Sequence, residues 1–287
     1  MMRNWIPAMV ILMLTGVLAC ASEPSADANP NGNQADSPVV AIDSPQVTVD
    51  SLEKSMPQTM KVDSLPKETL LGKISPGKDT AFALIASKYT TKSGIYLRKD
   101  AYAAFERMHA AAAKDGVNLV IVSAMRTFGD QKGIWENKWS GRTLVGGKNL
   151  STTVSDPVER AKAILRYSSM PGSSRHHWGT DMDLNSLENS YFDSGTGKKI
   201  YDWLTAHAAE YGYCQPYTLI GPDRPRGYQE ERWHWSYMPI STRFLAAYKH
   251  QIKLEDIGGF LGSETAQPLN IIEDYVGGIA PPCRDWH

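Results

Sequence analysis

The sequence has almost no net charge, few cysteines and no internal repeat. Its 30 basic and 31 acidic residues leave a formal charge of −1, which gives no support to nucleic-acid binding, since that function usually needs a basic face. Hydrophobic residues make up 42% of the chain and charged residues 21%, which is ordinary for a soluble globular protein. The length of 287 residues allows one or two domains.

The first twenty residues predict an export signal and not a part of the fold. Arg3 precedes a nearly unbroken apolar stretch, Ile6 to Leu18, which is too short for a comfortable membrane span. It ends in Val17-Leu18-Ala19-Cys20, which resembles the lipobox of bacterial lipoproteins. Cys20 would then carry the lipid, and the expected location is an exported, membrane-anchored lipoprotein facing the periplasm or cell wall. An ordinary secretory signal is the alternative, and it also takes the mature protein out of the cytoplasm.

The two remaining cysteines, Cys214 and Cys283, agree with export. An exported domain can pair two cysteines, and a bridge here would tie the C-terminal tail to the body of the domain. Two unpaired buried thiols are the alternative that the sequence leaves open.

Three further segments follow the predicted signal. Residues 21–73 are mostly rich in Ser, Pro, Asp, Asn and Gln without sustained apolar periodicity, so we expect a disordered tether. The ordered domain is expected from Ile74 to about Phe260. The tail, 261–287, is rich in Gly and Pro and is expected to pack on the domain.

The periodicity predicts an α+β fold: a single compact domain with a small, mainly antiparallel sheet that carries the functional site and is flanked by helices. Helices and short strands are mixed without strict alternation, which argues against a doubly wound sheet. From apolar spacing and β-branched runs we expect helices near 102–112, 128–139, 157–167, 200–211 and 242–250, and strands near 117–123, 181–184, 213–218 and 233–237.

Two of the seven histidines lie in segments suited to a metal site. One segment is Ser174-Arg175-His176-His177-Trp178-Gly179-Thr180-Asp181-Met182-Asp183, and the other is Glu230-Glu231-Arg232-Trp233-His234. A hydrolytic zinc site needs three protein ligands of the His or carboxylate type and an open position for water. A carboxylate near that water is well suited as general base. Together the two segments supply both.

The spacing of these residues resembles the LAS zinc peptidases, and most closely the VanY-like D-alanyl-D-alanine carboxypeptidases. The resemblance rests on Ser174-x-His176-x-x-Gly179-x-x-x-Asp183 and on Glu231-x-Trp233-His234, and it includes Ser123-Ala124-Met125-Arg126-Thr127-Phe128 upstream. It implies that His176, Asp183 and His234 hold Zn²⁺ and that Glu231 is the general base. Strand parity alone leaves Asp181 and Asp183 equivalent, and the family spacing selects Asp183.

The resemblance implies hydrolysis of the terminal D-Ala-D-Ala bond of peptidoglycan stem peptides by Glu-assisted attack of water activated at the zinc. L,D-carboxypeptidase, D,D-dipeptidase and stem-peptide endopeptidase activities use the same ligands and stay open. A non-catalytic wall-binding module is an alternative of another class, although the correctly spaced Glu231 does not favour it. The expected partners are stem peptides and, through the lipid anchor, a membrane.

Four residues are candidate substrate contacts. Arg126 is expected to contact either the oxyanion or the terminal carboxylate of the substrate. The alternative is that Arg126 only forms an ion pair at the protein surface. Gln131 lines the pocket or is a solvated helix residue, and Ser174 contacts substrate or orients His176. Tyr237 is the aromatic residue that we expect at the substrate.

Overall fold

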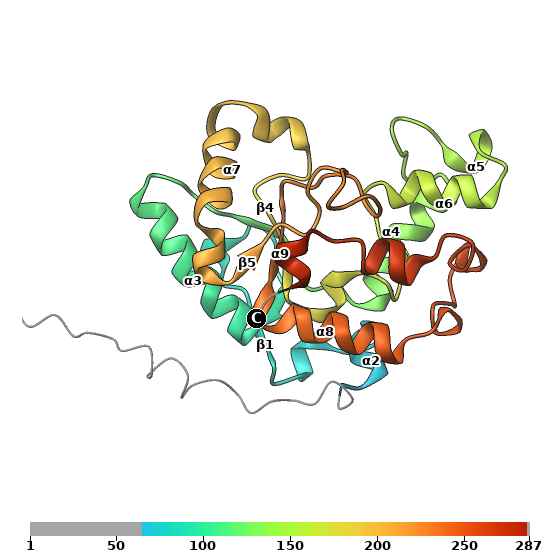
Figure 1. The fold of residues 1–287 in the computed structure, drawn as a ribbon, viewed down its shortest axis with the longest axis horizontal. Helices are drawn as coiled ribbons and strands as arrows, with labels where there is room; N and C mark the ends of the chain where they lie inside the picture. Colours follow the sequence, from blue (N-terminus) through green and yellow to red (C-terminus); the bar gives the residue numbers. More distant parts are fainter. Residues whose placement is uncertain (1–64, 286–287) are drawn as a thin grey trace, which may run out of the picture. The chain divides into compact units, whose positions relative to one another are not determined.

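The computed structural model describes residues 65–285, which form one unit around two small sheets (Figure 1). The predicted signal, Cys20 and most of the predicted tether, 21–64, lie outside the described residues. Within 65–285, no helix combines the length and the apolar character that a membrane crossing requires.

The larger sheet has four antiparallel strands in the order β3-β4-β6-β5. Its strands are β3 (Ile121–Ser123), β4 (Asp181–Leu184), β6 (His234–Tyr237) and β5 (Tyr213–Cys214). A second sheet pairs β1 (Phe82–Leu84) with β2 (Tyr96–Arg98). This is the expected α+β fold with a small antiparallel sheet, although β5 ends four residues before the predicted strand and β1 and β2 were not predicted.

Helices lie on both sides of the strands. In Figure 1, α3 and α7 lie to the left of the larger sheet, and α4, α5 and α6 to the right. The helix bounds are α2 (Lys67–Leu70), α3 (Lys99–Lys114), α4 (Phe128–Trp139), α5 (Leu150–Thr153), α6 (Pro157–Leu165), α7 (Gly195–His207), α8 (Met238–Gln251) and α9 (Pro281–Arg284).

One face of the larger sheet is apolar and the other carries the polar site. Side chains alternate along a strand, so Met182, Leu184 and Trp235 all lie on the face that packs against α3 and α7. Asp183 and His234 lie on the opposite face. A second apolar cluster joins α2, α4, α6, α8 and the tail. The polar face of the sheet therefore lies between two buried cores.

The folded part begins before Ile74, where we predicted the domain boundary. Leu70 is fully buried and Leu71 nearly so in the second cluster. The carbonyl of Gly72 accepts a hydrogen bond from the Phe128 amide at 2.7 Å. Residues 65–73 therefore belong to the domain and not to the tether, because two buried leucines anchor a segment whose composition is otherwise polar.

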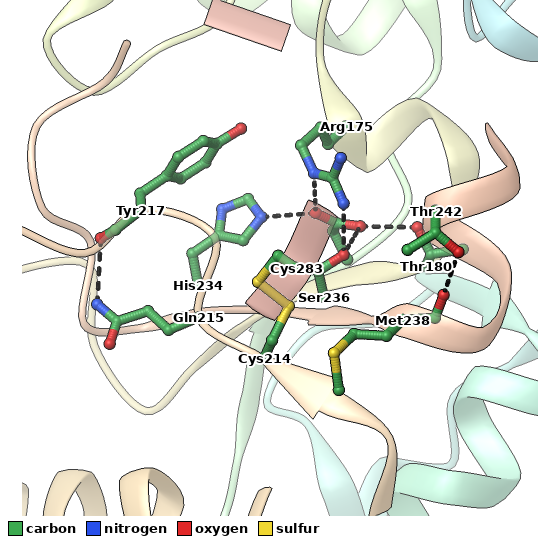
Figure 2. Close-up of a disulfide and its surroundings, with 11 residues drawn as sticks. Arg175, Thr180, Cys214, Gln215, Tyr217, His234, Ser236, Met238, Thr242 and Cys283 are labelled. Atoms are coloured by element: carbon green, nitrogen blue, oxygen red, sulfur yellow. Dashed lines mark hydrogen bonds and ion pairs between the residues drawn. A yellow bond between two sulfur atoms is a disulfide. The ribbon is translucent and has the colours of Figure 1, made fainter. Parts of the chain in front are cut away.

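The tail packs on the domain and is tied to it by a disulfide between Cys214 and Cys283 (Figure 2). Ile271 and Val276, in the π-helical turn η9 (Ile271–Val276), are fully buried. The Ala280 amide also donates to the Pro216 carbonyl at 2.8 Å. The bridge thus holds α9 against the edge strand β5, beside the strand that carries His234.

Candidate metal centre and active site

His176, Asp183 and His234 converge on one buried point. Each offers a ligand atom, and the three atoms lie within 4.8 Å of one another. His176 belongs to the short helix η4 (Arg175–Trp178), whereas Asp183 and His234 are direct partners across β4 and β6. The antiparallel register therefore sets two of the donors side by side, and η4 brings the third over them.

The imidazole of His176 is oriented by the backbone. Its Nδ1 donates to the Ala124 carbonyl at 2.8 Å, because a carbonyl can only accept. Nε2 is then left without a hydrogen and points at Oδ1 of Asp183, 3.4 Å away. Burial and the nearby charge of Arg126 lower the pKa of His176, so the ring is neutral as a metal ligand must be.

The imidazole of His234 is oriented by Asp181. Nε2 lies 2.9 Å from Oδ2 of Asp181, while Nδ1 lies 3.5 Å from Oδ1 of Asp183 and 3.1 Å from Oε2 of Glu231. Burial alone would lower the pKa of His234, but the hydrogen bonds to Asp181 and Glu231 and the charge of Asp183 outweigh it and raise the pKa to about 9. Carboxylates that hold a proton on this ring favour a divalent cation for the same electrostatic reason.

Asp181 is the centre of a fully buried polar network. Figure 2 labels its partners Arg175, Thr180, His234 and Ser236. Arg175 Nε donates to its Oδ2 at 3.1 Å, and the hydroxyls of Thr180 and Ser236 donate to its Oδ1 at 2.7 and 2.8 Å. Burial would raise the pKa of Asp181, but the Arg175 guanidinium and the His234 hydrogen bond hold it well below its usual range. Asp181 is therefore a carboxylate that orients a ligand and is not itself a ligand.

The donor set fits a small divalent ion in tetrahedral coordination. Ligand bonds of about 2.0–2.1 Å place neighbouring ligand atoms roughly 3.3–3.4 Å apart. Oδ1 of Asp183 lies at similar distances from Nε2 of His176, 3.4 Å, and from Nδ1 of His234, 3.5 Å. Among the described residues, Nε2 of His176 and Oδ1 of Asp183 are buried and have no hydrogen-bond partner. Two unpaired buried polar atoms that face each other are costly unless a ligand satisfies both.

Glu231 lies beside this cluster, 6% exposed. Its Oε2 is 3.1 Å from Nδ1 of His234, and its amide donates to the Tyr217 carbonyl at 2.9 Å. Burial raises the pKa of its carboxyl above the usual value, and the hydrogen bond from His234 only partly offsets that. A carboxylate with a raised pKa is suited to both taking and returning a proton near neutral pH.

Arg126 reaches the cluster from the loop between β3 and α4. Its Nη2 lies 3.8 Å from Oδ2 of Asp183, and its Nη1 donates to Oε1 of Gln131 at 3.1 Å. The backbone carbonyl of Arg126 accepts from Nδ1 of His177 at 2.7 Å. Gln131 is fully buried and donates in turn to the Ser169 carbonyl at 2.7 Å. Gln131 thus holds the guanidinium in place and is neither a solvated helix residue nor a wall of the pocket.

A cavity of about 890 Å³ opens onto the cluster. Its walls include all three candidate ligands, Glu231 and Arg126. Tyr217 and Tyr228 also line it, and they stack edge to face with ring centroids 4.9 Å apart. The arrangement is a water-accessible cleft with a cation site, a base and a guanidinium in one wall.

Two predicted substrate contacts do not line the cavity. Tyr237 lies three residues after His234, so its side chain lies on the opposite face of β6, where it packs on Tyr213 at 5.4 Å between ring centroids. Ser174 precedes η4 and is 1% exposed.

Gly179 ends η4 with a φ of 69°, and a Cβ there would lie 2.3 Å from the Phe82 ring, so this position requires glycine.

Sequence reasoning did not identify Asp181, Arg175 and Ser236 as one network, nor His177 and Lys138 as parts of the site. Strand parity carries a signal for the first group, because Asp181 and Ser236 share a face with Asp183 and His234. His177 bonds the Gly172 amide at 3.0 Å through Nε2, and nothing in the sequence indicates that contact.

A family model described as "VanY: D-alanyl-D-alanine carboxypeptidase" matches residues 94–240, just over half of the chain, and this range contains the whole cluster. The chain belongs to the VanY family. The predicted membership is confirmed. Among curated proteins, "Putative carboxypeptidase YodJ" of Bacillus subtilis (strain 168) is 32% identical over 148 residues, which are 50% of this chain and 46% of that protein. The VanY-family chain spans about half the length of the curated relatives it matches.

Solved structures also resemble the chain, at lower sequence identity. "VanYB in complex with D-Alanine-D-Alanine" is 22% identical with a TM-score of 0.42, over 62% of this chain and 87% of that one. The LdcB LD-carboxypeptidase is 21% identical with a TM-score of 0.43, over 70% and 81% of the two chains.

Proposed function

We propose that this protein is a zinc-dependent carboxypeptidase that hydrolyses the terminal D-Ala-D-Ala bond of peptidoglycan stem peptides. The observation that carries the proposal is the placement of Glu231 within 3.1 Å of His234 beside three convergent metal donors. Membership of the VanY family supports the substrate class.

Zinc is the proposed ion because two imidazoles and one carboxylate form a donor set typical of it. When bound, zinc would polarise the scissile carbonyl and acidify a water molecule. His176 Nε2, His234 Nδ1 and Asp183 Oδ1 would hold it. Asp181 would keep the His234 ring in the tautomer whose Nδ1 lone pair faces the ion.

The chain's own residues then have separate tasks. Glu231 removes a proton from the attacking water and returns it to the amine that leaves, as its raised pKa allows. Arg126, 3.8 Å from Asp183, lies where negative charge develops on the carbonyl oxygen and stabilises it. Gln131 and the His177 contact to the Arg126 carbonyl hold that guanidinium in place.

Cleavage of other bonds in the same stem peptide is the alternative to the proposed activity. L,D-carboxypeptidase, D,D-dipeptidase and endopeptidase activities would use the same ligands and base. A non-catalytic wall-binding module would not require a buried, correctly placed Glu231, so the geometry favours an enzyme.

Incubation of the zinc-loaded protein with stem pentapeptide and stem tetrapeptide tests the proposal. We expect the pentapeptide to lose one alanine by mass and the tetrapeptide to stay intact. Release of a dipeptide, or cleavage of the tetrapeptide alone, would assign the protein to one of the competing activities. No cleavage of either peptide would contradict the carboxypeptidase proposal.

We also propose that the protein is exported and anchored through Cys20. The Cys214–Cys283 disulfide supports export, since such bonds persist in oxidising compartments. Metabolic labelling with a fatty acid, compared between the native protein and Cys20→Ser, tests the anchor. Equal labelling of both proteins would contradict it.

A further inference from the structure

Lys138 brings a second cation to the wall of the cleft. It lies on α4, one residue before Trp139, and lines the same cavity as Arg126 and Glu231. Gln131 and Lys138 are seven residues apart, two helical turns, and so share one face of α4. Both bond the segment that follows α6, Gln131 through the Ser169 carbonyl and Lys138 through the Ser168 hydroxyl.

The ammonium of Lys138 lacks a negative partner within residues 65–285. Its hydrogen bond goes to Oγ of Ser168, a neutral and buried hydroxyl. Burial lowers the pKa of Lys138, and the positive charge of Arg126 lowers it further, while Glu231 acts in the opposite direction. A half-buried cation that faces a cavity without a counter-ion favours an anionic ligand.

Arg126 is already engaged at the metal cluster. One of its terminal nitrogens is bonded to Gln131, and the other faces Asp183. In the mechanism proposed above, its guanidinium stabilises the oxyanion at the reacting carbonyl, which leaves the free terminal carboxylate of a carboxypeptidase substrate to another cation. Ser168 accepts from Lys138 and keeps its own hydroxyl hydrogen, so the two side chains offer two adjacent donors to the two oxygens of a carboxylate.

We propose that Lys138 and Ser168 form the subsite that binds the terminal carboxylate of the substrate. The proposal rests on the proposed carboxypeptidase function and deepens it, because it names the groups that distinguish a free chain end from an internal peptide bond. In this arrangement Arg126 stabilises the oxyanion and does not bind the terminal carboxylate.

The test compares two substrates: the stem pentapeptide with a free C-terminal carboxylate and the same peptide with a C-terminal amide. The zinc-loaded native protein should prefer the acid. In Lys138→Met, kcat/KM for the acid should fall roughly 10- to 100-fold while kcat/KM for the amide stays the same, because only the acid loses a charged hydrogen bond. Lys138→Arg should keep most of the preference, and Ser168→Ala should lose a smaller part of it.

Lys132→Met is the matched control on the same helix. Its ammonium bonds the Gly259 carbonyl outside the cavity, so both substrates should be cleaved as by the native protein. Zinc content and circular dichroism identify variants that are misfolded.

Three outcomes would overturn the subsite. Lys138→Met could keep the native preference for the acid, or could slow both substrates equally, which is the mark of a structural role. A second pair of stems, with and without a side-chain carboxylate on the diamino residue, covers the third outcome: if Lys138→Met lost discrimination only within that pair, Lys138 would bind the side-chain carboxylate. Failure of the native protein to cleave either peptide would instead contradict the proposed function itself.

Discussion

His234 and Asp181 lie on neighbouring antiparallel strands, with Nε2 of the imidazole 2.9 Å from Oδ2 of the carboxylate. Asp181 accepts three further hydrogen bonds, from Arg175, Thr180 and Ser236. A ligand histidine is thus oriented by a carboxylate that is itself fixed on all sides, and the precision of the cluster depends on residues that never touch the ion.

Replacement of Asp181 should therefore weaken metal binding. We expect Asp181→Ala to lower zinc affinity roughly 10- to 100-fold, because the His234 ring loses its fixed tautomer. A competition titration with a zinc chelator measures this. Asp193→Ala, which removes a surface ion pair with Arg232, should leave the affinity unchanged. Equal affinities in the Asp181 variant and the native protein would show that Asp181 has no such role.

Glu231 should be needed for turnover and not for the metal. Glu231→Gln should lower kcat by about 10²- to 10⁴-fold, because the general base is lost, while zinc content stays near one per chain. His176→Ala should lose the metal together with the activity. Glu230→Gln is the control, since that side chain bonds Arg232 and not the cluster. Native turnover in Glu231→Gln would exclude the mechanism.

Substitutions at Arg126 and at Tyr237 should have very different effects on turnover, although both residues were predicted to contact substrate. Arg126→Met should cost about 10²- to 10³-fold in kcat through loss of oxyanion stabilisation. Tyr237→Phe should leave kcat/KM within about twofold of native, because its ring lies on the far face of β6. Steady-state kinetics on the pentapeptide measures both. A large loss in Tyr237→Phe would place its hydroxyl at the substrate after all.

Acid should destabilise the metal-free protein through Asp181. Its pKa is depressed in the folded state, so its contribution is complete above the unfolded value of about 3.9 and is lost as the pH falls below that. Each such group adds up to about 1.4 kcal/mol per pH unit to the slope of unfolding free energy. Urea unfolding between about pH 2 and pH 4 should show a shallower slope of unfolding free energy against pH for Asp181→Asn than for the native protein. Identical slopes would contradict the ionised state assigned to Asp181.

Loss of the disulfide should lower stability without reshaping the cleft. The bridge closes a loop across 69 positions, for which chain entropy predicts about 4 kcal/mol. We expect the double variant Cys214→Ser, Cys283→Ser to lose up to that amount in urea unfolding, and the reduced native protein to match it. Unchanged stability in both would mean that the tail is held by its apolar contacts alone.

The sequence predicts the elements with strong local signals. Thr127 caps α4, accepting from the Asp130 amide and bonding the Asp130 carboxylate, and α4 has the bounds that were predicted. The strand at 181–184 was also predicted with its observed bounds. By contrast, β1 and β2 have three residues each and lie in no longer β-branched run, unlike β3, which ends the run 117–123.

The cluster itself was predictable from family spacing, whereas its supports were not. The contact between Arg175 and Asp181 depends on the turn of η4 and on the left-handed Gly179, which reverse the chain between them. The parity that ties Asp181 to Asp183 also places Tyr237 on the face of β6 opposite His234, and that placement could have been predicted from the sequence alone.

The pairing of Asp183 with His234 and of Asp181 with Ser236 repeats every second residue along both strands. A slip of two residues would keep the hydrophobic face inward and set Asp181 opposite His234, so apolar packing alone does not forbid it. The contacts of Ser236 to Asp181 and to Arg175 do, because they join β6 to β4 and η4 in the observed alignment only. Correct strand alignment and the capacity to take up an ion are thus acquired in the same folding step.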